Sequence, residues 1–167
     1  MRPFEYAELL QDHALFRDAL INAPESLFVG LTPAEILAHK SELVGELILD
    51  ASFKLLTRIE ADIRSDFIET IVKNWMDSLS RKYVRVLGRT KNPNHVGAGP
   101  ILEAICRHFR AVGDPFEAEC VELREYFRFR HWYAHGRFLV IMPTVPFPSR
   151  LEQLGRKIFA TVIARTH

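Results

Sequence analysis

The chain has 167 residues, 48% of them hydrophobic and 26% charged, with a formal net charge of +1. This length predicts a single domain that buries a proper hydrophobic core, and the composition is that of an ordinary globular protein. The near-zero net charge excludes an overall basic field. Any role in nucleic-acid binding must therefore come from local clustering of basic side chains.

The cysteines and the N-terminal residues predict a cellular compartment. Cys106 and Cys120 stand alone without a CxxC pair, which favours buried free thiols over a disulfide framework. The first residues, MRPFEYAELL, carry acidic side chains where a signal peptide needs an apolar run, and no uninterrupted apolar segment has membrane-spanning length. We therefore expect a cytoplasmic protein with no membrane partner.

The first third of the chain reads as helix. A helix from about Glu5 to Ile21 is expected to pack across the rest of the molecule. In LTPAE, Thr32 and Glu35 match a capping box, and Pro33 occupies the first helical position. Three further helix starts are predicted downstream of this one. They are at Pro100, at Asp114 with Pro115 and Glu117, and at Ser149 with Glu152.

The segment 33–87 has apolar residues at steps of three, four and seven, and neither glycine nor proline interrupts residues 46–87. A single helix over 33–87 would span roughly 80 Å, far more than the diameter of a small domain. We therefore predict a break between residues 64 and 78, with Asp66 or Asp77 as the cap of a second helix.

Two connectors follow. GRTKNPNHVGAGP is predicted to be a loop that exposes Arg89, Lys91 and His95, and MPTVPFP to be a stiffer connector because prolines fix their own φ angles. FLVIM, at 138–142, is compatible with a short extended piece.

The segment 127–138, FRFRHWYAHGRF, is the richest in chemistry. It lies in the helix that Asp114 opens, Gly136 is placed to end that helix, and His135 falls in its last turn. Four arginines oppose one acid, Glu125, in the most basic window of the chain. These arginines are Arg124, Arg128, Arg130 and Arg137. Such a surface suits a phosphate-bearing ligand.

Arginine and histidine together suggest a reaction. An imidazole exchanges protons near neutral pH, and a guanidinium stabilises charge on a phosphoryl oxygen. The pair could cleave RNA without a metal, with the 2′-hydroxyl as internal nucleophile. The same residues also fit a purely structural helix end, because cations there favour the helix dipole. The aromatic side chains of the segment are expected to serve as core and interface. They are Phe127, Phe129, Trp132 and Tyr133.

The run RHWYAHG, residues 130–136, resembles the signature of the HEPN superfamily: an arginine, a polar residue, a short spacer and a histidine, often followed by glycine. The order of segments is similar to the RiboL-PSP type of HEPN domain. In that type a long first helix precedes a stretch like DSLSR (77–81), a loop, a helix like ILE (101–103) and the motif helix. The similarity covers residues 32–165.

This resemblance implies an all-α bundle of about five helices in a single domain, 1–167, with residues 1–31 as N-terminal helix and connector. It implies a homodimer whose motif helices face each other, so that both arginine–histidine pairs line one cleft. Many such domains are metal-independent endoribonucleases that act as toxins or in phage defence and leave a cyclic phosphate. The implied partners are RNA and a cognate antitoxin or defence-system protein, with no cofactor and no metal.

Carried over by residue, the resemblance makes Arg130 the stabiliser of phosphoryl charge, His135 the proton carrier and His131 a group that orients the phosphate. Arg130 and His135 point about 140° apart on a straight helix, so a cleft between two helices suits them better than one surface. The predicted contacts to the RNA backbone are Arg124, Arg128 and Arg137. Arg137 stands where HEPN proteins paired with a nucleotidyltransferase carry tyrosine, which argues against modification there.

One acidic residue is a candidate assistant. Glu60 interrupts an apolar stretch of the sequence. TRIE (57–60) also fits a capping-box-like pattern on a solvated helix surface, and this structural interpretation is favoured.

Three alternatives stay open. His131 and His135, four residues apart, could bind a metal with His95 or His108, but Trp132 stands where the HExxH pattern needs glutamate. A HEPN-like module could bind RNA or nucleotide, or mediate dimerisation, without catalysis. A structural bundle could also dock a basic partner on an acidic row, which comprises Glu42, Glu46 and Asp50.

Overall fold

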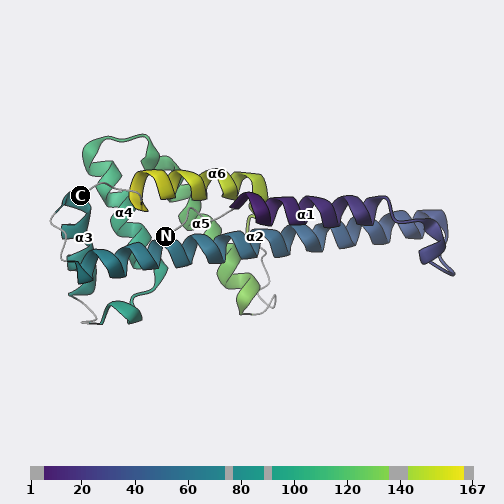
Figure 1. The fold of residues 1–167 in the computed structure, drawn as a ribbon, viewed down its shortest axis with the longest axis horizontal. Coiled ribbons are helices and arrows are strands. Elements are labelled where there is room, and N and C mark those ends of the chain that lie inside the picture. The colour runs from purple at the N-terminus through teal and green to yellow at the C-terminus, as the bar shows by residue number, and fades with distance from the viewer. Residues whose placement is uncertain (1–5, 74–76, 89–91, 136–142, 164–167) are drawn as a thin grey trace.

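The computed structural model describes residues 6–73, 77–88, 92–135 and 143–163 (Figure 1). These residues form six α-helices and no strand, which confirms the all-α prediction with one helix more than the five expected. The helices are α1 (Tyr6–Ile21), α2 (Pro33–Val72), α3 (Ser78–Leu87), α4 (Ala98–Val112), α5 (Phe116–Ala134) and α6 (Pro148–Ile158). Short 3-10 turns η1 (Glu25–Leu27) and η2 (Pro93–His95) and a π-helical turn η3 (Phe159–Ile163) join or extend them. None of the described helices is both long and apolar enough to span a bilayer.

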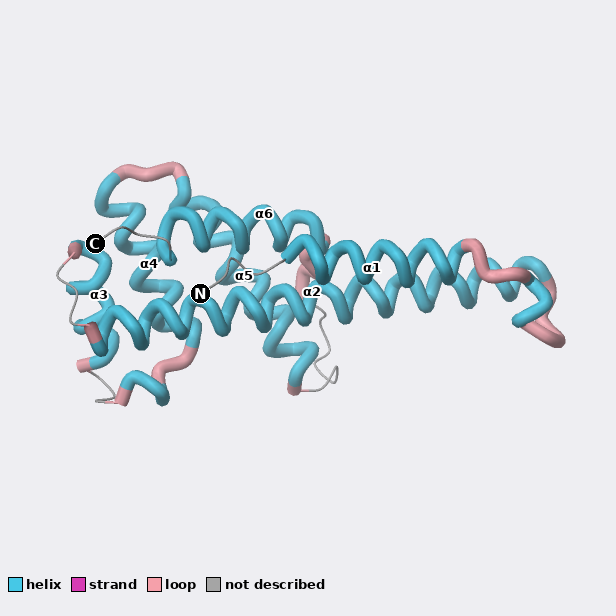
Figure 2. The backbone as a smooth tube through the Cα atoms, in the orientation of Figure 1, coloured by secondary structure: helices cyan, strands magenta, loops and turns pink. Residues whose placement is uncertain are grey.

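Helix α2 is the spine of the molecule. Its 40 residues span about 60 Å, and its first half pairs with α1 in an arm that projects beyond the other helices (Figures 1 and 2). Helices α3 to α6 gather around its second half. The portion of α2 that leaves the bundle is covered by α1.

The predicted break in segment 33–87 is confirmed. Helix α2 ends at Val72, and Asp77 caps α3 by accepting a hydrogen bond from the Ser80 backbone N–H at 2.7 Å. Asp66, the other candidate cap, is buried inside α2 and accepts a hydrogen bond from the Tyr83 hydroxyl at 3.0 Å.

The predicted helix starts had mixed outcomes. The capping box of Thr32 and Glu35 is confirmed in both directions. Helix α4 starts two residues before Pro100, which lies in its first turn where proline is tolerated. Helix α5 starts at Phe116, whose backbone N–H donates to the Asp114 side chain at 2.8 Å.

The predicted cap at Ser149 is wrong. Helix α6 begins at Pro148, because the fixed φ of proline suits the first helical position, and Phe147 is the cap residue. Glu152 pairs with Arg156 one turn later instead of with Ser149.

Some predictions concern residues outside the described ranges. They are the extended segment FLVIM, the helix end at Gly136, and the exposed loop residues Arg89 and Lys91.

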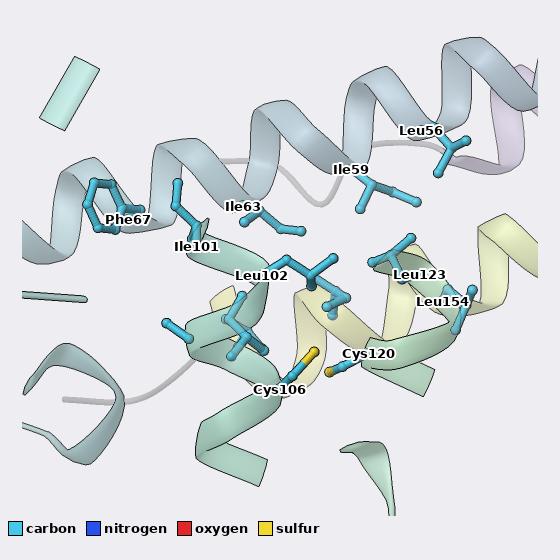
Figure 3. Close-up of a cluster of buried hydrophobic side chains, with 14 of the residues drawn as sticks. Leu56, Ile59, Ile63, Phe67, Ile101, Leu102, Cys106, Cys120, Leu123 and Leu154 are labelled. Carbon is cyan, nitrogen blue, oxygen red and sulfur yellow. The ribbon is translucent and has the colours of Figure 1, made fainter. Parts of the chain in front are cut away.

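One hydrophobic core joins the bundle. Figure 3 shows α2 presenting Leu56, Ile59, Ile63 and Phe67 to side chains from α4, α5 and α6. Cys106 on α4 and Cys120 on α5 turn their sulfur atoms toward each other, and both are free and buried, as predicted. The hydrogen bond that Cys120 makes with Cys106, and then burial, raise the pKa of the Cys120 thiol.

A second contact fixes α1 to the bundle. The buried Tyr6 hydroxyl donates to Asp62 on α2 at 2.8 Å, and Arg58 pairs with the same carboxylate at 3.1 Å. Burial first, and the Asp62 carboxylate next, raise the pKa of Tyr6. The tyrosine ring lies on Gly155 of α6, where an added Cβ would stand 2.8 Å from the ring.

Replacing Gly155 with alanine is expected to destabilise the protein by about 1–3 kcal/mol, because the new methyl group must displace the Tyr6 ring. Gly45, in α2, is the matched control: nothing lies within 4 Å of an added Cβ. Gly45→Ala should stabilise by about 0.5–1 kcal/mol through helix propensity. Urea unfolding measures both changes, and a Gly155→Ala protein as stable as the wild type would contradict the Tyr6 contact.

Candidate functional site at the end of helix α5

The motif helix ends where the sequence predicts. Helix α5 ends at Ala134, and the backbone N–H of His135 donates to the carbonyl of His131 at 3.1 Å. His135 therefore lies at the C-terminal end of the helix, where carbonyl groups point outward. The predicted cap Gly136 lies outside the described residues.

Arg130 faces inward from this helix end, toward α2. Its Nη2 atom lies 3.1 Å from Oε2 of Glu60, and the side chains of Arg130 and Glu60 are 28% and 15% exposed. Glu60 is therefore not the solvated surface residue that the sequence favoured. It lies on the same helix as the core residue Ile59, and it holds the arginine of the motif in an ion pair between two helices.

The ion pair leaves part of the Arg130 guanidinium unused. Within the described ranges, its Nε atom is buried and has no hydrogen-bond partner, and the contact to Glu60 is made through Nη2. A structural arginine–carboxylate pair more often uses two parallel hydrogen bonds. The buried Nε is closed to a ligand, so a phosphate would have to meet the guanidinium through its Nη groups.

The two histidines of the motif are brought together. Their ring centroids lie 4.4 Å apart, with an angle of 49° between the planes, and both residues are exposed. Imidazoles at this distance can act on one substrate group or on neighbouring ones. Arg130 is half-buried and His135 exposed, in agreement with the different directions expected from their spacing on the helix.

The other arginines of the window are less available than the sequence indicates. Arg124 donates to Glu103 of α4 at 2.7 Å, and Arg128 pairs with Glu125 at 2.8 Å. Together with Glu60, carboxylates from three helices thus neutralise three of the four arginines. The fourth, Arg137, lies outside the described residues. Glu60 and Glu103 lie far from this basic window in the sequence. The window itself therefore contains only one of the three carboxylates, that of Glu125.

The aromatic side chains pack as predicted. Phe129 and Trp132 are buried, and Phe127 and Tyr133 lie half-buried against the core. Tyr133 also stacks on Phe53 of α2, with ring centroids 4.9 Å apart. The Tyr133–Phe53 contact anchors the helix end to α2.

A metal site at the histidine pair finds no further ligands in the part of the chain that the structure describes, where no three His, Cys, Asp or Glu side chains are grouped. His108 instead interacts with Ser78 at 3.3 Å, and His95 lines a separate pocket next to α3. In the acidic row, Asp50 pairs with Lys54 at 2.7 Å.

Comparison of the chain with known protein families, curated proteins and solved structures found no match.

The Glu60 contact can be tested by Glu60→Gln, which keeps the shape of the side chain and removes its charge. We expect a loss of about 1–2 kcal/mol in the free energy of unfolding, because a half-buried guanidinium loses its counter-charge. Glu125→Gln is the control, because Arg128 is largely exposed; its loss should stay below about 0.5 kcal/mol. Equal losses in urea unfolding would show that the Glu60 pair is an ordinary surface contact.

Proposed function

We propose that this protein is a metal-independent endoribonuclease of the HEPN type, with Arg130 and His135 as catalytic residues. The observation that carries the proposal is the Glu60–Arg130 ion pair. It positions a guanidinium at the helix end that also bears the two exposed imidazoles. Arginine and histidine fixed at one helix end supply charge stabilisation and proton transfer for the same phosphate.

The proposed reaction needs only groups of the protein and the RNA. The 2′-hydroxyl oxygen attacks the adjacent phosphorus, and the bond from phosphorus to the 5′-oxygen breaks. His135 moves the protons, and Arg130 stabilises the negative charge on the non-bridging oxygens. The products are a 2′,3′-cyclic phosphate and a 5′-hydroxyl. His131, next to His135, is proposed to orient the phosphate, and no cofactor or metal takes part.

The site is proposed to be completed by a second copy of the chain. In one copy Arg130 turns toward α2 while His135 remains exposed, so a phosphate in contact with both residues fits a cleft better than a single convex helix end. In a homodimer with facing α5 helices, each phosphate would meet two arginine–histidine pairs. A role as a toxin or defence protein, with a cognate inhibitor as partner, belongs to the same proposal.

A non-catalytic module remains the second candidate, and one observation favours it: the ion pair with Glu60 by itself gives Arg130 a structural role. Such a module would bind RNA or nucleotide, or would only mediate dimerisation. RNA that raises the thermal midpoint without being cut would favour this candidate.

The catalytic proposal predicts that the wild-type protein cuts end-labelled RNA in excess EDTA and leaves 2′,3′-cyclic phosphate ends. His135→Ala should slow cutting by about 100-fold or more, because proton transfer is lost, and should leave the unfolding midpoint nearly unchanged. His39→Ala, which changes an exposed histidine of α2, is the control and should cut normally. RNA that stays intact with the wild type, or is cut equally by His135→Ala, would contradict the proposal.

A further inference from the structure

A seam of residues along α2 has the spacing with which helices pack in a coiled coil. Its members follow one another in steps of four and three residues, so they share one face of the helix. They are Leu37, Ser41, Val44, Ile48, Ala51 and Leu55. All but the serine are apolar, and an apolar seam of this kind is stable only where another helix covers it.

The bundle covers only one end of this seam. Ala51 and Leu55 are buried, Val44 and Ile48 are half-buried, and Leu37 is 71% exposed. Exposure therefore rises toward the free end of the arm, which projects beyond helices α3 to α6 (Figures 1 and 2). The part from Leu37 to Ile48, about 17 Å long, is covered incompletely.

This open part of the seam borders a groove of about 350 Å³ at the end of the arm. Aliphatic side chains from both helices of the arm line it, among them Ile21 of α1 with Leu37 and Val44 of α2. The remaining lining residues are Glu25, Pro33, Ile36, Lys40 and Ser41. An apolar groove between two helices is the kind of surface that binds the apolar face of a third helix.

The walls of the groove are fixed before any partner binds. Lys40 reaches from α2 to the end of α1, where its ammonium donates to the carbonyls of Ile21 and Ala23 at 2.9 Å and 2.7 Å. On the other side of the turn, the capping box of Thr32 and Glu35 fixes the start of α2. A preformed site of this kind loses little conformational entropy on binding.

The charge of the arm determines the kind of partner. Residues 6–50 carry eight acidic side chains and two lysine or arginine side chains, whereas residues 51–167 carry twelve acidic and nineteen basic ones. Both cations of the arm are engaged within it, because Lys40 is held by carbonyls and Arg17 pairs with Asp18 at 2.9 Å. Glu25, in the lining of the groove, has no cationic partner among the described residues.

This negative charge disfavours two other occupants. The arm of a second copy carries the same charge, so two arms would repel each other. Anionic lipids would repel the arm for the same reason, since they attract basic surfaces. A protein segment with lysine or arginine beside its apolar face is attracted.

We propose that the groove of the arm binds an amphipathic helix of a partner protein, with leucine-like side chains against the seam and lysine or arginine at its edges. The bound helix would extend to Leu37 the cover that the bundle gives to Ala51 and Leu55. The proposal is independent of RNA cleavage, because none of these residues belongs to the Arg130 site.

A designed helical peptide serves as the probe. It has about three heptads, with leucine at positions a and d, lysine at e and g, and a fluorescein label. Fluorescence anisotropy with the full-length chain should show binding that weakens as salt is raised. The same peptide with glutamate at e and g should bind about ten-fold more weakly, because its charge has the same sign as that of the arm.

Two exposed leucines of the arm form a matched pair of variants. Leu37 and Leu15 are 71% and 62% exposed, but Leu15 lies on α1 and does not line the groove. Leu37→Gln should weaken binding of the lysine peptide about ten-fold or more, and Leu15→Gln less than about two-fold, with similar unfolding midpoints. No binding of the lysine peptide, equal binding of the glutamate peptide, or equal losses from the two variants would overturn the proposal.

Sedimentation equilibrium of the chain alone tests the competing occupant, a second copy. The wild type and Leu37→Gln should have the same oligomeric state, because no second copy occupies the groove. A dimer that is lost in Leu37→Gln and kept in Leu15→Gln would place a second copy in the groove and would overturn the proposal.

Discussion

The proposed site depends on one interaction, the ion pair that ties Arg130 at the end of α5 to Glu60 in the middle of α2. A long arginine side chain at a helix end ordinarily samples many rotamers, and ordering it costs about 1–2 kcal/mol of side-chain entropy. Glu60 offsets that cost before any substrate arrives. The carboxylate fixes one Nη group, so the guanidinium is already in position when a phosphate arrives, as a preorganised electrostatic site requires.

Helix α2 makes this arrangement possible. Core residues of the neighbouring turns, among them Ile59 and Ile63, hold α2 in place against the bundle. The position of Glu60 relative to α5 is fixed as a result. The stacking of Tyr133 on Phe53 adds a second fixed point between the two helices. At its other end the same helix runs beyond the bundle and is covered by α1, which Tyr6 and Asp62 lock in place. Motion of the motif helix relative to α2 would break packing, stacking and the ion pair together.

Local signals in the sequence were enough to predict the helical class, the start of α2, the cap at Asp77 and the burial of both cysteines. Each depends on residues close together in the chain or on simple periodicity. The cap at Ser149 failed because Pro148 competes for the same helix start one residue earlier. The pairing of α1 with the first half of α2 outside the bundle was not predicted, because periodicity does not show which helices cover each other.

The site was predictable only in part. The motif residues and their helix end could be located from spacing, whereas the partners of the arginines could not. Glu60 and Glu103 approach Arg130 and Arg124 through tertiary packing, so the charge of a sequence window overstated the basic character of the surface.

Arg130→Lys tests the central claim most directly, because lysine keeps the charge that Glu60 needs and loses the planar donor array that a phosphate would use. Stability and RNA cutting should be measured on the same preparation. The account predicts an unfolding free energy within about 1 kcal/mol of the wild type and a rate of RNA cutting reduced about ten-fold or more. Unchanged cutting, or a loss of activity that merely follows unfolding, would contradict a catalytic role for Arg130.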